Sequence, residues 1–227
     1  MKIGLKSDFH DYYDHCFTTP WEVADKLVER LTTVGMPNAT TMLYLDSIGL
    51  VTPTHGRVQE LVPVVIERSG MPEAIAEKLF ELVVYVDEYS DIHTDKLRLN
   101  CRDALARYPE AYASVFIPSY PGLGGSSLRY LRLGMRAFWL RYTSKDDWRS
   151  HSGQVQIELL GEEPRTGQAH AIPYPLFAID FVKSDRLYAV GLDIAPRLQG
   201  TGIEHLITAD EVYQELCAAR LGSSKTA

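Results

Sequence analysis

The sequence predicts an α+β protein whose mostly antiparallel strands are flanked by helices. In much of the first half, apolar residues recur every three or four positions, a spacing typical of helices. The second half consists largely of short apolar or alternating runs separated by turn residues, which is typical of antiparallel strands. Because helices and strands are segregated along the chain, the pattern favours α+β. With 227 residues and 45% hydrophobic content, the chain can bury a full core as one large domain or two small lobes.

The first half is expected to contain three helices before its first strand. They are predicted over residues 20–34, 39–47 and 57–68. Gly49 ends the second helix, and Pro63 interrupts the third because proline removes a backbone donor and crowds the preceding turn. The elements that follow are a strand over 80–86, a short helix over 99–108, a strand over 114–118 and a loop over 119–127.

The second half is expected to be a run of antiparallel strands. Strands over 129–133 and 136–143 flank Gly134 and indicate a hairpin, and residues 154–160 alternate between polar and apolar. A second hairpin within residues 177–193 and a helix over 209–221 complete the pattern. The predicted organisation is an N-terminal helical region over 1–78, a core over 79–208, and a C-terminal helix and tail over 209–227.

The second hairpin is the most informative stretch, because each of its apolar arms carries an acid. Asp180 and Asp193 each stand between two large apolar residues. A carboxylate inside an apolar strand is unfavourable unless it is paired or binds a cation. The hairpin is therefore a candidate cation site.

Two registers of this hairpin are open. A two-residue turn at Ser184-Asp185 would separate Asp180 and Asp193 by roughly 13 Å along the strands. A four-residue loop would set Asp180 opposite Gly191 and bring Asp193 to the adjacent diagonal, roughly 7 Å away. Both registers keep the two acids on one face, because a shift of two residues preserves parity. Only the second register supports a shared Mg²⁺ site, which requires oxygen ligands.

The order of these residues resembles the metal-binding end of the ATP-grasp superfamily. There, a hairpin usually carries an Asp, then Glu-x-Asn, then a Pro-Gly turn. The corresponding residues here are Asp180, Gly191-Leu192-Asp193 and Ala195-Pro196. The resemblance implies an ATP-grasp-like fold with a nucleotide cleft, ATP and Mg²⁺ as cofactors, and Asp180 and Asp193 as metal ligands.

The resemblance extends upstream, over roughly residues 40 to 205. Residues 45–53 are similar to the helix-to-strand passage before the nucleotide lobe, and residues 82–86 to the strand that presents a phosphate-binding lysine. Residues 114–118 are similar to the hinge strand that meets adenine, which implies nucleotide contacts for Phe116 and Ile117. Residues 129–134, 141 and 147–151 fall where the family places arginines that contact substrate and phosphate. The implied catalytic residues are Arg129, Arg141 and Arg149, and the further nucleotide contacts are Arg141 and His151.

Several positions depart from the family pattern. Gly191 stands where the family has a metal-binding Glu, and Tyr85 or Val86 stands where the lysine is expected. Val115 replaces the hinge acid, whereas Asp193 for Asn keeps an oxygen ligand and adds charge. Two interpretations therefore stay open. One is an ATP-dependent ligase that activates a small-molecule or peptide-like carboxylate for attack by an amine or similar nucleophile. The other is a degenerate relative that binds a ligand without turnover.

Composition and net charge limit which binding partners and which cellular compartment are expected for this protein. A net charge of −7 argues against a general nucleic-acid binder, although an accessory protein whose central arginines meet phosphates is a weaker third interpretation. The apolar runs are of strand length, and a membrane span needs roughly 20 apolar residues. Cys16, Cys101 and Cys217 form no CxxC pattern, which suits a reducing cytoplasm. Composition does not predict the oligomeric state.

Four other segments carry polar or glycine-rich patterns. The loop over 121–127 is a candidate phosphate cradle or a plain hairpin loop, and the loop over 197–202 is a candidate pocket wall or a simple connection. His10, Asp11, Asp14, His15 and Cys16 have metal-site spacing only if they lie on a helix, and contact with substrate is the alternative. Asp91, His93 and Asp95 are expected in a solvated loop.

Overall fold

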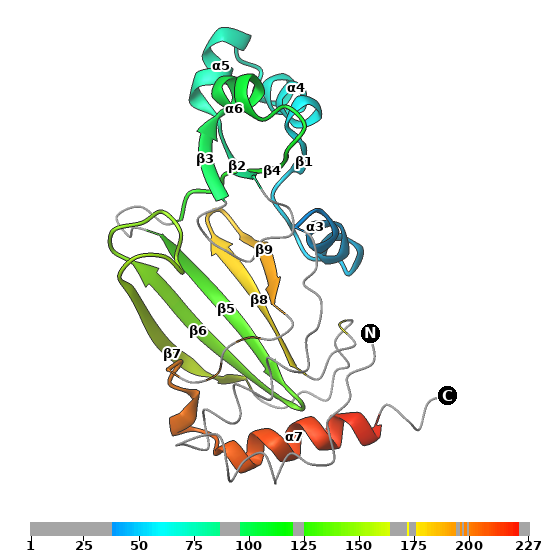
Figure 1. The fold of residues 1–227 in the computed structure, drawn as a ribbon, viewed down its shortest axis with the longest axis vertical. Helices are drawn as coiled ribbons and strands as arrows, with labels where there is room; N and C mark the ends of the chain where they lie inside the picture. Colours follow the sequence, from blue (N-terminus) through cyan, green and yellow to red (C-terminus); the bar gives the residue numbers. More distant parts are fainter. Residues whose placement is uncertain are drawn as a thin grey trace.

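A computed structural model of the chain describes residues 38–86, 96–119, 125–163, 172, 176–193, 196, 198 and 200–222. The described strands form two antiparallel sheets, one of four strands and one of five, with helices on their outer faces (Figure 1). The predicted α+β class is confirmed. The predicted helix over 20–34, the cluster at His10–Cys16 and the loop containing His93 lie outside the described residues.

The four-stranded sheet is covered on one face by three helices (Figure 1). The strand order is β1-β4-β2-β3, from β1 (His55–Arg57), β2 (Glu81–Tyr85), β3 (Lys96–Asn100) and β4 (Tyr112–Val115). The helices are α4 (Val58–Ser69), α5 (Glu73–Leu79) and α6 (Cys101–Arg107). Leu82, Val84 and Ala113 point toward the helices and are fully buried, because alternate residues of a strand face opposite sides. The three helices leave the other face of this sheet uncovered, and that face points to the interior of the molecule.

Local sequence fixes where these helices begin and end. Gly70 adopts a left-handed conformation (φ 64°) and ends α4, although Pro63 lies inside that helix. The side chain of Asn100 accepts a hydrogen bond from the backbone of Asp103 and starts α6. The helix predicted over 99–108 is therefore two residues too long at its start, because Leu99 and Asn100 end strand β3.

The five-stranded sheet has the order β7-β6-β5-β8-β9. Its strands are β5 (Ser126–Leu133), β6 (Arg136–Ser144), β7 (Val155–Glu163), β8 (Leu176–Lys183) and β9 (Leu187–Asp193). One face packs against α7 (Ala209–Gly222) and the short 3-10 turn η2 (Ile203–His205), through Leu131, Phe138 and Val212. The opposite face packs against α3 (Asn38–Ser47), through Leu45 and Phe177. Figure 1 shows α7 across the end of this sheet and α3 beside β9.

Within the described residues, four elements were not predicted: β1, α5, β3 and η2. The loop predicted over 119–127 is shorter than expected, since Ser126 and Ser127 already pair with β6. The boundary predicted at residue 79 falls inside a packed unit, because α4 shares one core with β2 and β4.

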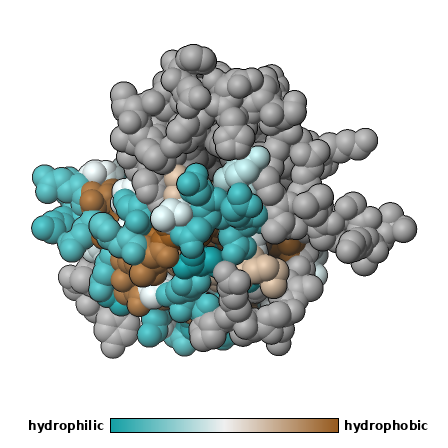
Figure 2. All heavy atoms as spheres, turned by 90° about the horizontal axis from the view of Figure 1, so that it is seen from below, coloured by the Kyte–Doolittle hydropathy of each residue, from teal (hydrophilic) through white to brown (hydrophobic). Residues whose placement is uncertain are grey.

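The described surface is predominantly polar at the α7 end of the molecule. Seen from below, hydrophilic residues cover most of the coloured area, with apolar residues exposed in several places between them (Figure 2). No helix in the described ranges has both the length and the apolarity needed to cross a bilayer.

Candidate functional site

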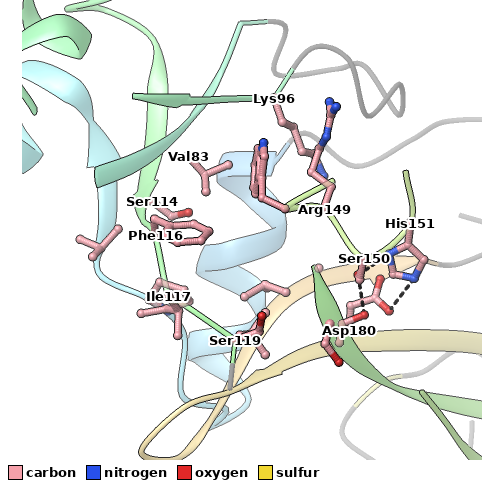
Figure 3. A pocket seen from close by; sticks show the side chains of 18 of the residues that line it. Val83, Lys96, Ser114, Phe116, Ile117, Ser119, Arg149, Ser150, His151 and Asp180 are labelled. Atoms are coloured by element: carbon pink, nitrogen blue, oxygen red, sulfur yellow. Dashed lines mark hydrogen bonds and ion pairs between the residues drawn. The ribbon is translucent and has the colours of Figure 1, made fainter. Parts of the chain in front are cut away.

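A cavity of about 150 Å³ lies between the two sheets, and we call it the inter-sheet cavity. Strands β2, β3 and β4 of the small sheet line it on one side, and strands β5, β8 and β9 of the large sheet on the other. Figure 3 shows Phe116 and Ile117 on one side, with Ser150, His151 and Asp180 opposite them. A more open groove continues from the cavity past Lys96 and Arg149. Together they can accommodate an elongated ligand.

The face of the small sheet that is not covered by helices forms part of the cavity wall. Tyr85 lies directly opposite Lys96, and Val83 lies opposite Ser114, so these four side chains share one face and all line the cavity. Lys96 also contacts the ring of Tyr85, with its Nζ atom 5.5 Å from the ring centroid. The pairing register therefore places the ammonium group of Lys96, on β3, at the cavity wall.

Phe116 stands between two other side chains at the cavity wall. The guanidinium of Arg98 lies 4.0 Å from the centroid of the Phe116 ring. Trp148 packs edge-on against the same ring, with the two centroids 5.7 Å apart. This alternation of aromatic and cationic groups offers a flat apolar surface beside positive charge. Phe116 and Ile117, the two residues of this segment with predicted nucleotide contacts, thus line the cavity.

The loop after β6 carries four cavity residues, Trp148 to His151, and is tightly braced. The fully buried hydroxyl of Ser144 donates to the carbonyl of Ser152 (2.6 Å) and accepts from the backbone of Asp147 (3.1 Å). Gly125 supports the loop from the opposite side. A β-carbon at Gly125 would lie 2.5 Å from the backbone of Trp148, so only glycine fits without displacement.

Within this loop, Arg149 and Asp147 form an ion pair of 2.6 Å. The hydrogen bond from the Arg149 side chain holds the pKa of Asp147 well below its ordinary value, despite an opposing effect of burial. The pair fixes the guanidinium at the rim that the cavity shares with the groove. Arg149 is therefore a preorganised cation at the cavity.

The hairpin of β8 and β9 pairs Asp180 with Gly191, as the second of the two open registers predicts. The pairing is reached by a different connection, however. Ser184–Arg186 form a three-residue turn closed by Lys183 and Leu187, and Val190 is an extra residue bulged out of β9. The three-residue turn and the one bulged residue together place Asp180 opposite Gly191, as a four-residue loop without a bulge would. Asp193 lies opposite Ala178, two positions further along β8.

Both acids contact one arginine. Arg129 lies directly opposite Asp180 in the pairing of β5 with β8. Its Nε and Nη2 atoms each donate a 2.8 Å hydrogen bond to one carboxylate oxygen of Asp180. Its Nη1 atom lies 3.6 Å from Oδ2 of Asp193. The side chain of Arg129 is only 12% exposed, so this is a buried ion-pair network and not a surface contact.

Aromatic groups surround this network. The guanidinium carbon of Arg129 lies 5.1 Å from the centroid of the Tyr142 ring, and the ring of His151 lies 4.3 Å from the same ring. His151 Nε2 is 3.7 Å from Oδ1 of Asp180, and Nδ1 is 3.1 Å from the Ser150 hydroxyl (Figure 3). The histidine thus links the braced loop to the acid.

The local field keeps Asp180 ionised. Burial alone raises the pKa of this carboxyl, but the charge and hydrogen bonds of Arg129 outweigh burial, with help from His151 and Lys96. The result is a pKa of about 2. Burial also raises the pKa of the neighbouring Tyr142 hydroxyl, so the phenol stays neutral.

The predicted position of Arg141 in the cleft is wrong. Arg141 lies opposite Leu128, whereas Arg129 lies opposite Leu140. Side chains directly opposite each other share a face, so Arg129 and Arg141 project from opposite faces of the sheet. The side chain of Arg141 is 44% exposed and pairs with Glu158 on β7 at 2.9 Å. Strand parity therefore separates it from the other predicted site residues.

The side chains that could act as metal ligands limit how the expected Mg²⁺ ion could bind. Among the described residues, no group of three or more His, Cys, Asp or Glu side chains converges as a metal site. Asp180 uses both carboxylate oxygens on Arg129, and Gly191 supplies no ligand. Mg²⁺ often takes only one or two protein carboxylates and completes its coordination with phosphate oxygens and water. Asp180 and Asp193 therefore fit an ion that arrives with a phosphate ligand better than a free ion.

Lys96 was not predicted as a cavity residue. The resemblance implied a phosphate-binding lysine on β2, whereas the lysine that lines the cavity lies on the paired strand β3. The alternation Lys96-Leu97-Arg98-Leu99 is a period-two pattern and was the signal for that strand. Ser114, Trp148 and Ser150 also line the cavity without having been predicted.

Comparison with known proteins places the fold. No protein-family model matches the sequence, and no curated protein matches it. The ATP-grasp ligase PsnB, solved in complex with a minimal precursor, superimposes with a TM-score of 0.52 at 14% identity, over 81% of this chain. The chain has an ATP-grasp-like fold. It spans 60% of the length of PsnB.

Two further solved structures align more loosely. A RiPP-associated ATP-grasp ligase from Chryseobacterium gregarium, in complex with ADP and a leader and core peptide, aligns over 98% of this chain and 72% of its own, at 15% identity and a TM-score of 0.48. The macrocyclase MdnC from Microcystis aeruginosa MRC, bound with precursor peptide MdnA, aligns over 96% of this chain and 74% of its own, at 12% identity and a TM-score of 0.45.

Proposed function

We propose that the inter-sheet cavity of this ATP-grasp-like protein binds ATP, and that the protein activates a carboxylate for attack by an amine or similar nucleophile. One observation carries the proposal: Lys96 on β3 and Arg149 in the loop after β6 both line one cavity, which also contains the largely buried, ionised Asp180. Two cations beside an acid, between flat apolar walls, suit a ligand that combines a base with phosphates.

The cavity walls suggest how the nucleotide lies. Phe116 and Ile117 offer apolar surface to the base, and Trp148 limits the space beside Phe116. Lys96 and Arg149 would face the phosphates, and His151 would lie near the phosphate end beside Asp180. In this arrangement Lys96 supplies the cation that β2 lacks, since it lies directly opposite Tyr85.

Magnesium would enter with the phosphates. Asp180 and Asp193 would hold it, and its chemistry there would be to neutralise charge on the phosphate oxygens. Arg129 lies beside both acids and offsets part of their negative charge before a ligand binds.

The proposed reaction has two transfers. A carboxylate oxygen of the substrate attacks the γ-phosphorus of ATP, so the bond to the β-γ bridging oxygen breaks and ADP leaves. The nucleophile then attacks the carbonyl carbon of the acyl phosphate, loses a proton and releases phosphate. Lys96 and Arg149 would stabilise the charge on the transferring phosphoryl group, which is the main task of a protein in this chemistry. A small-molecule or peptide-like carboxylate suits the open groove, and PsnB was solved with a minimal precursor.

The test is substrate-dependent ADP release. The protein is incubated with ATP, Mg²⁺ and a panel of amino acids and short peptides, and ADP is measured by a coupled assay. We expect ADP above the rate of ATP hydrolysis alone for one substrate class, and loss of that rate in Lys96→Met. Absence of ADP release across the panel, in a protein that binds the ATP analogue, would count against the ligase.

A second candidate is a protein of the same fold that binds a ligand without turnover. Both oxygens of Asp180 are paired with Arg129, and Gly191 supplies no carboxylate. These two features leave fewer free metal ligands than phosphoryl transfer normally uses. Tight nucleotide binding with no ADP release in the same panel would select this candidate.

A further inference from the structure

We infer that Arg129 controls access of divalent cations to Asp180 and Asp193, so that cation binding follows binding of the phosphate ligand. The inference deepens the proposed function and in part rests on it. The guanidinium lies beside both carboxylates, and it excludes a second cation until phosphate oxygens draw it away.

Strand pairing alone brings the three side chains together. Arg129 on β5 is opposite Asp180 on β8, and Asp180 is opposite Gly191 on β9. Asp193 lies two residues beyond Gly191 and therefore points to the same face. Because Gly191 carries no side chain, the space between the two acids is left to the long side chain that reaches across from β5. The arrangement is fixed by the backbone and needs no loop to form it.

The hydrogen bonds of the guanidinium engage both oxygens of Asp180. Both oxygens accept hydrogen bonds of 2.8 Å, in the bidentate geometry that is strongest for arginine and carboxylate. Asp193, with its side chain 38% exposed, is the more accessible acid, and its Oδ2 atom is 3.6 Å from Nη1. The guanidinium cannot lose its proton at any working pH. A divalent ion at this place would therefore meet a permanent positive charge.

A phosphate ligand can change this balance. Asp180 itself lines the inter-sheet cavity, so an anion bound beside Lys96 and Arg149 competes with Asp180 for the same guanidinium. Arginine binds phosphate in the same bidentate way as it binds carboxylate. Once Arg129 turns to the phosphate, it no longer offsets the negative charges of the two acids. A divalent cation bound to phosphate oxygens then finds two carboxylate ligands.

A matched arginine in the same sheet provides the control. Arg136 on β6 also forms a bidentate pair, with two 2.7 Å hydrogen bonds to Glu162. Its side chain is as protected as that of Arg129, at 11% exposed. The pair does not line the inter-sheet cavity. Removing Arg136 therefore disrupts a comparable ion pair elsewhere in the same sheet.

The experiment measures Mn²⁺ binding without nucleotide by electron paramagnetic resonance. Mn²⁺ replaces Mg²⁺ because both prefer oxygen ligands. We expect no saturable Mn²⁺ site in the wild type or in Arg136→Met, and one site in Arg129→Met that disappears in Arg129→Met with Asp180→Asn. Mn²⁺ should also raise the melting temperature of Arg129→Met and leave that of the wild type unchanged. Equal Mn²⁺ affinity in the wild type and Arg129→Met would overturn the inference.

A second measurement uses the wild type and does not depend on the folding of Arg129→Met. By reciprocal linkage, a cation that binds only with the phosphate ligand must tighten that ligand. We expect Mn²⁺ to raise the affinity for a non-hydrolysable ATP analogue at least tenfold, and Asp193→Asn to lose most of that gain. An affinity that does not change with Mn²⁺ would contradict the inference. If the analogue fails to bind under any condition, the proposed function fails, while the nucleotide-free experiment still decides the role of Arg129.

Discussion

Lys96 lies directly opposite Tyr85 in the pairing of β2 with β3, and both side chains line the inter-sheet cavity. The phenol of Tyr85 is buried, and burial raises its pKa, so it stays neutral beside the ammonium. Lys96 is thus the cation that the small sheet presents to a ligand. The proposed function depends on this lysine because Arg149, which also lines the cavity, comes from the loop after β6.

Replacing Lys96 by methionine should weaken nucleotide binding at least tenfold. A hydrogen bond to a charged group is worth about 1.5–3 kcal/mol, and methionine keeps the length of the side chain without the charge. Calorimetric titration with a non-hydrolysable ATP analogue gives the affinity. Lys78→Met on α5, outside the cavity, is the matched control and should bind as the wild type does. Equal affinities for the two variants would remove Lys96 from the site.

The Arg129–Asp180 pair predicts an acid-labile contribution to stability. The pKa of Asp180 is about 2, below its ordinary value of 3.8, so the ionised form stabilises the folded state above pH 4. That contribution, about 2 kcal/mol by linkage, is lost as the pH falls from 4 towards 2. Urea unfolding over this range should show a steeper loss for the wild type than for Asp180→Asn. Asp210→Asn, at an exposed acid of α7, should keep the wild-type slope.

Gly125→Ala should disturb the loop that presents Arg149 and His151. The added methyl would lie 2.5 Å from the backbone of Trp148, and relief requires the loop to move. Strain of this kind typically costs about 1–3 kcal/mol, and nucleotide affinity should fall with it. Gly56→Ala on β1 is the control, since a β-carbon there meets nothing within 4 Å. A Gly125→Ala protein with unchanged melting temperature and affinity would show that the close packing has no role.

Gly191→Glu should increase divalent-cation binding. A β-carbon at Gly191 would be 3.7 Å from Oδ2 of Asp180, an ordinary contact, so the first carbon of a side chain fits there. Once Arg129 is removed, the added carboxylate would be a third oxygen ligand on the face that carries Asp180 and Asp193. We therefore expect tighter Mn²⁺ binding in Gly191→Glu than in Gly191→Gln when both are combined with Arg129→Met and measured without nucleotide. Identical Mn²⁺ binding by the two variants would show that the new carboxylate does not reach the acids.

The sequence predicted the elements more reliably than the direction of individual side chains. The pairing of Asp180 with Gly191 is one of the two registers that the sequence left open, and the actual hairpin reaches it with a three-residue turn and a bulge. Arg141 was misplaced because its face depends on the register between β5 and β6, which the hydrophobic pattern of one strand does not define.

The ion-pair partner of Asp180 could also not be predicted from the sequence. Arg129 and Asp180 are separated by 51 positions, and only the pairing of β5 with β8 makes them neighbours. The acids were correctly recognised as needing compensation, but an arginine supplies it in this structure where a metal was expected. Lys96 was missed because the short strand β3 was partly assigned to the following helix.

The most direct test of the proposed function is a calorimetric titration of the wild-type protein with a non-hydrolysable ATP analogue and Mg²⁺. We predict saturable binding at one site per chain, weakened at least tenfold in Lys96→Met and unchanged in Lys78→Met. No measurable heat at millimolar analogue, in a protein shown to be folded by its melting transition, would contradict nucleotide binding in the inter-sheet cavity.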